Sequence, residues 1–119
     1  MLSPMDRERR RHVRLKPIPE LPARAIVAVD GLVREAIDII DVSVSGLALR
    51  SGGGLAGAKQ GQRLKLTLDL SAWGEHQVDV DVRWTSPAAV GVELADPSPA
   101  ASQAVNRYVA ELLERGVSG

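Results

Sequence analysis

Two stretches of the chain alternate apolar and polar residues with a period of two, and this pattern constrains the fold more than any other feature of the sequence. The apolar positions are Leu64, Leu66, Leu68 and Leu70 in the first stretch and Val78, Val80, Val82 and Trp84 in the second. Successive side chains of a strand point to opposite faces, whereas a helix brings together residues three or four apart. Both stretches are therefore predicted to be strands with one buried face.

Four shorter segments are also predicted to be strands. They cover residues 23–29, 32–42, 47–50 and 90–94. Asp30 and Gly31 separate the first two, and an Asp-Gly pair between β-branched runs favours a tight hairpin turn. Closing a sheet removes its unpaired edges. The predicted fold is therefore mainly β, a closed or nearly closed six-stranded antiparallel β-barrel.

The end of the chain changes to a helical period. Ser98 is a candidate N-cap with Pro99 at the first helical position, and Gly116 is placed to end the helix. The apolar stripe consists of Val105, Tyr108, Val109, Leu112 and Leu113. We expect this amphipathic helix to lie over one face or mouth of the barrel.

The first 22 residues are predicted to form a basic arm. Residues 1–16 contain six Lys or Arg against two acidic residues, although the chain of 119 residues has no formal net charge. Pro17, Pro19 and Pro22 disfavour helix beyond Lys16. The arm has few apolar side chains with which to pack, so we expect it to be flexible. The predicted single domain thus has an arm at 1–22, a barrel at 23–96 and a helix at 97–119.

Composition argues against several classes of function. The chain has no cysteine and two histidines, which excludes thiolate metal sites and leaves little for a histidine site, so neither a metal nor a cofactor is predicted. No apolar run approaches the roughly 20 residues of a membrane span. Charged residues stand where a signal peptide has its apolar region. We therefore expect a cytoplasmic protein that does not associate with membranes.

Two motif matches are rejected by their context. Gly52, Gly54 and Gly57 have the spacing of a dinucleotide-binding fingerprint, but the next segment leads into a strand rather than a helix. A flexible loop is predicted there. The segment that begins at Asp41 resembles the start of a calcium loop, yet Gly52 stands where a bidentate Glu is needed.

Two other motifs carry residues suited to ligand binding. Arg10 and Arg14 are four residues apart, which places both guanidinium groups on one side of a helix or a strand. Guanidinium suits phosphate groups and the edge of guanine. Asp41 offers an acceptor to the N1–H and 2-amino groups of guanine, and Ser43 adds a hydroxyl. Gly46 lets the backbone approach a ligand or turn with a positive φ. Taken singly, these motifs also fit a solvated basic arm and an Asx turn.

The order of the motifs resembles that of the PilZ domain family. The matching segments are Arg9-Arg10-x-x-x-Arg14, Asp41-x-Ser43-x-x-Gly46, Val82-Arg83-Trp84 and Gly91-Val92-Glu93-Leu94, followed by the helix. The resemblance runs from about Glu8 to Arg115. It implies a six-stranded β-barrel that binds the bacterial second messenger cyclic di-GMP.

The resemblance also implies roles for single residues. Arg10 and Arg14 would contact the phosphates and the faces or edges of guanine. Asp41, Ser43 and Gly46 would line the guanine pocket on the barrel. The ligand-binding residues expected from the motifs are thus an arginine pair on the arm and three residues at the start of the third strand.

Arg9 bears on the number of ligand molecules. In the PilZ family the residue just before the arginine pair tends to distinguish binding of one molecule from binding of an intercalated pair, and an arginine resembles the second case.

As a whole, the resemblance implies a stand-alone receptor, not an enzyme. We expect it to bind cyclic di-GMP as an intercalated dimer and to relay the signal to a protein partner by closing the arm over the barrel.

Two other functions stay open on the sequence. A nucleic-acid-binding β-barrel would use the basic arm on phosphates, but only Trp73, Trp84 and Tyr108 could stack on bases. An enzyme acting on a nucleotide would have Asp41 as its lone candidate, without an acid and base at defined spacing. Competition by a polyanion such as heparin would distinguish nucleic-acid binding from nucleotide binding.

Overall fold

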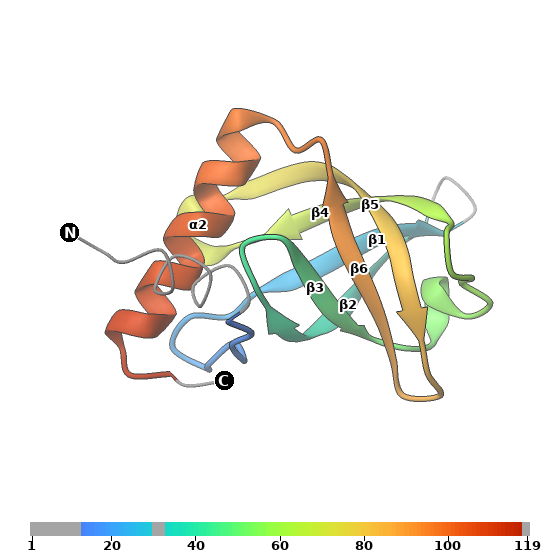
Figure 1. The fold of residues 1–119 in the computed structure, drawn as a ribbon, viewed down its shortest axis with the longest axis horizontal. Helices are drawn as coiled ribbons and strands as arrows, with labels where there is room; N and C mark the ends of the chain where they lie inside the picture. The colour runs from blue at the N-terminus through green and yellow to red at the C-terminus, as the bar shows by residue number, and fades with distance from the viewer. Residues whose placement is uncertain (1–12, 30–32, 118–119) are drawn as a thin grey trace.

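Six antiparallel strands close into a barrel in the order β1-β2-β3-β6-β5-β4 (Figure 1). This computed structural model describes residues 13–29 and 33–117. The elements are β1 Arg24–Val29, β2 Val33–Val42, β3 Gly46–Arg50, η1 Gly53–Leu55, β4 Arg63–Asp69, η2 Ser71–Trp73, β5 Glu75–Thr85, β6 Ala89–Ala95 and α2 Pro99–Glu114. The predicted barrel and C-terminal helix are confirmed. Pairing of Val29 with Val33 confirms the first hairpin, while the expected Asp30-Gly31 turn lies outside the described residues.

The interior of the barrel is filled by the apolar residues of the alternating stretches. Leu66 and Leu68 of β4 and Val80 and Val82 of β5 are buried, and the residues between them are only partly buried. Strands with this pattern bury one face and leave the other to water. The outer face of the barrel is therefore free to carry the charged and polar side chains.

The alternation of β5 breaks near its end. Val82 pairs with Val92 and Trp84 pairs with Gly91, so β5 has one residue more than β6 at this point. A β-bulge of this kind bends the strand and re-aims the side chains that follow. Trp84, which the alternation places on the buried face, lies on the surface with 42% of its area exposed. The prediction for Trp84 is therefore wrong, and the bulge is the reason.

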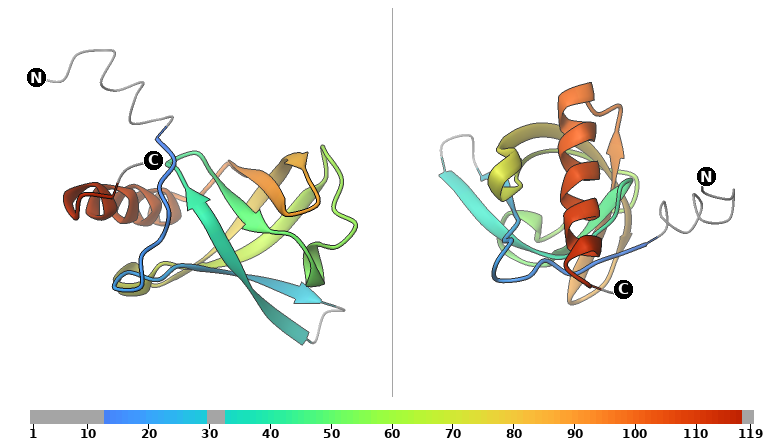
Figure 2. Two further views of the ribbon diagram at one scale, coloured as in Figure 1. Left: turned by 90° about the horizontal axis from the view of Figure 1, so that it is seen from below. Right: turned by 90° about the vertical axis from the view of Figure 1, so that its left-hand side faces the viewer.

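Helix α2 runs across one end of the barrel (Figure 2). The hydroxyl of Ser98 accepts a hydrogen bond from the backbone N–H of Ala101 at 3.1 Å, which confirms the predicted N-cap. Gly116 follows the helix with a φ of 82°, a conformation that glycine adopts without strain. Within the described residues, no helix has both the length and the apolar character needed to span a bilayer.

The predicted apolar stripe of α2 is confirmed except at its last position. Val105, Val109 and Leu112 are buried, and so is Tyr108. The ring of Tyr108 meets that of Trp73 edge to face, with ring centroids 6.1 Å apart. Leu113, by contrast, is 37% exposed. The helix is thus attached to the barrel by a narrower stripe than the sequence indicates.

Residues 13–22, here called the strap, pack against the barrel and α2. Leu15 is buried and exchanges two backbone hydrogen bonds with Val42, at 2.9 and 2.8 Å. Leu21 is buried as well, and its carbonyl accepts the hydroxyl of Tyr108 at 2.6 Å. The expectation that the arm cannot pack is therefore wrong for the strap, because these two leucines enter the core. Residues 1–12 lie outside the described residues, and the domain boundary at residue 22 stays a prediction.

The glycine-rich loop leads into β4, as predicted from its context. It contains the short 3-10 turn η1, and the backbone N–H of Gly54 donates to the carboxylate of Glu35 at 3.0 Å. A Cβ at Gly53 would lie 1.9 Å from the same carboxylate. The loop therefore wraps closely around a carboxylate of its own chain.

Replacing Leu112 with Ala is expected to lower the free energy of unfolding by about 2–4 kcal/mol, because it leaves a cavity between α2 and the barrel. Leu113→Ala removes the same atoms from a partly exposed position and serves as the matched control. We expect it to cost less than about 1 kcal/mol. Urea denaturation measures both values, and equal losses would show that the helix is not held by the Leu112 face.

Burial raises the pKa of Tyr108 to about 12. An exposed tyrosine in the unfolded chain has a pKa of about 10. The stability contributed by the neutral phenol is therefore complete below the lower pKa and is lost as the pH rises towards the higher one, by at most about 1.4 kcal/mol per pH unit. We expect Tyr108→Phe to lose less stability than the wild type between these pKa values. Tyr108 is the single tyrosine of the chain, so tyrosinate absorbance of the native protein checks the pKa directly.

Candidate ligand-binding site

Arg14 and Asp41 contact each other, although they are 27 residues apart in the chain. The Nη1 of Arg14 donates to Oδ1 of Asp41 at 2.7 Å. The next residue of each segment continues the contact, because Leu15 pairs with Val42 through the backbone. Strap and β2 therefore run side by side, and this pairing brings together one member of each predicted binding motif.

A β-bulge near the end of β2 precedes this contact. Ile39 pairs with Leu49 and Asp41 with Ala48, so Ile40 is an extra residue on β2. The side chains of Arg14 and Asp41 are 43% and 25% exposed. An ion pair with this much access to water contributes about 1 kcal/mol or less to stability. A ligand can therefore replace it at small cost.

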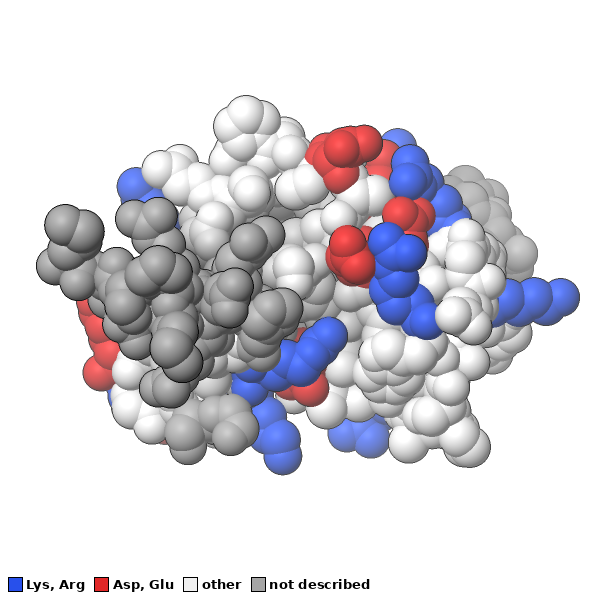
Figure 3. Space-filling view, in the orientation of Figure 1, with Lys and Arg blue, Asp and Glu red and all other residues white. Residues whose placement is uncertain are grey.

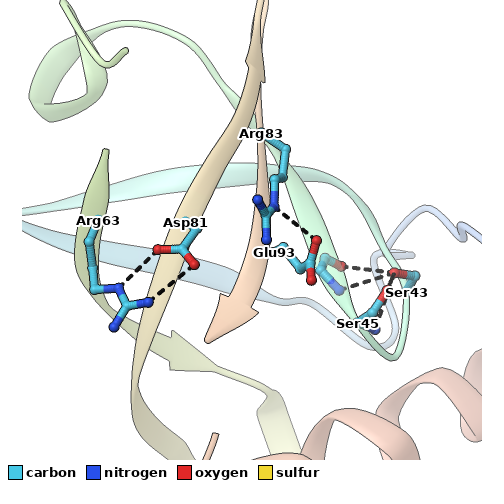
Figure 4. Close-up of polar contacts among 7 residues, drawn as sticks. Ser43, Ser45, Arg63, Asp81, Arg83 and Glu93 are labelled. Atoms are coloured by element: carbon cyan, nitrogen blue, oxygen red, sulfur yellow. Dashed lines mark hydrogen bonds and ion pairs between the residues drawn. The ribbon is translucent and has the colours of Figure 1, made fainter. Parts of the chain in front are cut away.

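Ser43 is turned into the hairpin that joins β2 to β3. It is buried, and its hydroxyl accepts the backbone N–H groups of Gly46 at 3.1 Å and Ser45 at 3.4 Å (Figure 4). The same hydroxyl donates to the carbonyl of Gly46 at 3.2 Å. In this arrangement Ser43 holds the turn that follows Asp41, and its predicted contact with guanine stays a prediction.

Gly46 is required by the packing of β3 against β6. A Cβ at this position would lie 2.3 Å from the carbonyl oxygen of Val92, far inside contact distance. Its φ is not positive, unlike that of Gly52 and Gly53 in the next loop. The sequence predicts a close approach of the backbone to a ligand or a positive φ at this position. The structure shows a close approach to a neighbouring strand instead, and the contact of Gly46 with a ligand stays a prediction.

A shallow pocket of about 110 Å³ opens beside the Arg14–Asp41 contact. The lining residues are Arg14, Ser45, Gly46, Arg83, Trp84, Gly91, Val92 and Glu93. The ring of Trp84 covers Gly91 so closely that a Cβ there would lie 2.1 Å from the indole. Of the predicted site residues, Arg14 and Gly46 line the pocket. Asp41 does not line it but contacts Arg14 at its edge.

Arg83, Trp84 and Glu93 were not among the predicted site residues. Their segments appear in the family resemblance, but strict alternation places Trp84 inside the barrel, and the bulge of β5 that exposes it leaves no signal in the sequence. Arg9 and Arg10, the other predicted ligands, lie outside the described residues.

Basic and acidic side chains lie next to one another on the outer face of the barrel (Figure 3). Arg63 donates to both oxygens of Asp81 at 2.9 and 3.2 Å, and Arg83 donates to Glu93 at 2.9 Å (Figure 4). The hydrogen bond between Arg63 and Asp81 raises the pKa of the guanidinium and lowers that of the carboxyl. Over residues 13–29 and 33–117, the face in view therefore presents paired charges and not the broad basic surface of a general nucleic-acid binder.

Across residues 13–29 and 33–117, no three His, Cys, Asp or Glu side chains come together in a way that could hold a metal ion. The residues that line the pocket supply guanidinium, carboxylate, hydroxyl, indole and backbone groups. These groups bind anions and planar bases through charge, hydrogen bonds and stacking.

Comparison with known proteins decides the family. The sequence matches the PilZ domain over residues 8–111. This chain belongs to the PilZ domain family. A search of curated proteins found no match to this PilZ domain.

Solved structures share the fold of this PilZ domain at low sequence identity. The PilZ domain of YcgR from Escherichia coli, described with c-di-GMP, is 15% identical with a TM-score of 0.70, and the match covers 91% of this chain and 94% of that one. MrkH of K. pneumonia in a c-di-GMP complex is 18% identical with a TM-score of 0.71, over 87% of this chain and 52% of that one. MotI of Bacillus subtilis, an inhibitor of motility, is 18% identical with a TM-score of 0.66, over 90% and 52%. The chain thus spans about half the length of the last two.

Replacing Gly46 with Ala is expected to lower the free energy of unfolding by about 1–3 kcal/mol, because the backbone of Val92 must move away. Gly91→Ala is the matched control on the paired strand, since its Cβ meets the Trp84 side chain, which can swing aside. We expect the control to change tryptophan fluorescence and to cost less stability. Equal losses in denaturation would contradict the assignment of Gly46 to strand packing.

Proposed function

We propose that this PilZ domain is a receptor that binds cyclic di-GMP and performs no covalent chemistry. The observation that carries the proposal is the contact of Arg14 with Asp41 at the edge of a pocket lined by Trp84. It joins an anion-binding group, a guanine-binding group and a stacking surface on one face of the barrel. A guanine nucleotide offers a partner to each of the three groups, namely a phosphate, the edge of the base and the face of the base.

Each of the three side chains matches one part of the ligand. The carboxylate of Asp41 can accept from N1–H and the 2-amino group of guanine, whereas adenine offers an acceptor at N1. The guanidinium of Arg14 can bind a phosphate in bidentate fashion. The exposed ring of Trp84 can stack on a base. We propose that Arg14 exchanges its bond to Asp41 for a phosphate when the guanine takes its place.

The solved structures that resemble this chain support the ligand class. The YcgR PilZ domain and MrkH are both described with c-di-GMP. Their sequence identity to this chain is below one fifth, so their similarity supports the fold alone. The proposal that this chain binds the same ligand rests on its family and on the side chains at the pocket.

Arg9 and Arg10 are proposed to complete the site from the arm. The backbone pairing of Leu15 with Val42 fixes the chain next to Asp41. Four residues of extended chain span at most about 14 Å, which is the reach available to Arg10 from Arg14. We propose that this part of the arm closes over the ligand, that Arg9 helps to hold a second, intercalated molecule, and that the closed arm is presented to a protein partner.

The test is a calorimetric titration of the full chain with cyclic di-GMP. Binding is expected for the wild type, with much weaker binding of cyclic di-AMP. Arg14→Ala is expected to weaken binding by about 1.5–3 kcal/mol, the scale of a charge-assisted hydrogen bond. The matched control is Arg50→Ala, which removes an arginine from another surface ion pair, with Asp38, outside the pocket.

The outcomes separate the parts of the proposal. A wild type that does not bind overturns the receptor assignment, and equal affinity for cyclic di-AMP overturns the role of Asp41. Saturation near two molecules per chain, falling towards one in Arg9→Leu, is expected if an intercalated pair binds. A wild-type stoichiometry of one contradicts the role of Arg9 alone. Displacement of cyclic di-GMP by heparin or single-stranded DNA would favour a nucleic-acid site instead.

A further inference from the structure

Arg83 is brought to the pocket by the bulge of β5. Because β5 has an extra residue between Val82 and Trp84, the consecutive residues Arg83 and Trp84 are both exposed, where alternation would bury one of them. Both line the pocket. A basic side chain and a stacking surface therefore come from the same short stretch of β5, which is paired with β6 on both sides of the bulge.

Glu93 fixes the guanidinium of Arg83 but leaves most of it available. Among the described residues, one hydrogen bond holds Arg83, from Nε to Oε2 of Glu93 at 2.9 Å (Figure 4). An arginine has five N–H donors, so the two terminal nitrogens keep theirs. The side chains of Arg83 and Glu93 are 56% and 52% exposed, and both line the pocket that Arg14 borders.

The two arginines that line the pocket belong to different segments of the chain and are bonded to different carboxylates. Arg14 belongs to the strap and is bonded to Asp41, a group that the proposed ligand needs for itself. Arg83 belongs to the barrel, and its partner Glu93 has no part in the proposed recognition of guanine. An anionic ligand that meets Arg83 therefore gains a contact without giving up another, whereas the charge of Glu93 opposes the ligand at the same place.

We propose that Arg83 is a further ligand-binding residue, a phosphate contact carried by the barrel itself, and that Glu93 sets the affinity of the site by opposing the same phosphate. The proposal rests on the proposed function, since it assigns a phosphate of cyclic di-GMP to Arg83. It differs from the two binding motifs in its origin, because neither contains this residue.

The neighbouring pair of Arg63 and Asp81 provides the comparison. It is also a cross-strand pair on the outer face, with Arg63 bonded to Asp81 at 2.9 and 3.2 Å, but neither residue lines the pocket (Figure 4). Arg63→Leu removes the same charge from the protein as Arg83→Leu. Glu75→Gln, at the opposite end of β5, removes the same charge as Glu93→Gln. Each control keeps the net charge of its test variant.

The experiment measures the affinity of these four variants and the wild type for cyclic di-GMP at several salt concentrations. We expect Arg83→Leu to weaken binding about threefold to tenfold and to flatten the salt dependence, and Glu93→Gln to strengthen binding about twofold to fivefold. The two controls should stay within about twofold of the wild type. A change of salt dependence is a readout that a purely structural role of Arg83 in the bulge would not produce.

Each result decides between the hypotheses. If the wild type binds and Arg83→Leu behaves like Arg63→Leu, the assignment of Arg83 is overturned while the receptor function stands. If the wild type does not bind, both are overturned. Weaker binding in Glu93→Gln would overturn the opposing role of Glu93. Circular dichroism and thermal unfolding check each fold, and Arg83→Gln, which keeps a polar side chain on the bulge, replaces Arg83→Leu if that variant unfolds.

Discussion

The antiparallel pairing of β3 with β6 is the constraint on which the rest of the structure depends. It joins segments almost fifty residues apart, closes the barrel, and places Gly46 opposite Glu93. The pairing is tight enough to require a residue without Cβ at Gly46. In the barrel, β2 is the other neighbour of β3, and β5 is the other neighbour of β6. The pairing of β3 with β6 therefore brings the β2 bulge near Asp41 and the β5 bulge near Trp84 to one region of the surface. The pairing that closes the barrel on this side therefore also determines where the pocket lies.

The features that the sequence predicts correctly are those that local patterns determine. Period-two alternation in β4 and most of β5 reflects one buried face, and it holds wherever strands pair in regular register. The N-cap at Ser98 is equally local, since its hydroxyl reaches a backbone N–H three residues away. Such patterns sufficed for six strands, the helix and the closed barrel.

The features that the sequence could not predict depend on contacts between distant segments. A bulge is decided by how two strands fit together, so the exposure of Trp84 and its place in the pocket had no local signal. The motif residues Arg14 and Asp41 were chosen for their chemistry, but their contact depends on the pairing of Leu15 with Val42. Ser43 was predicted to bind the ligand, but its hydroxyl is hydrogen-bonded to the backbone of its own hairpin. The motif alone could not distinguish these two uses of the hydroxyl.

The strap changes the thermodynamics of any binding event at this face. Ordering the backbone of one residue costs roughly 1–2 kcal/mol in conformational entropy. For residues 13–22 that cost is met when the protein folds, because Leu15 and Leu21 are buried and Tyr108 holds the carbonyl of Leu21. The backbone that carries Arg14 is therefore ordered beside β2 before a ligand arrives, and a ligand that binds Arg14 does not have to supply the free energy of ordering residues 13–22.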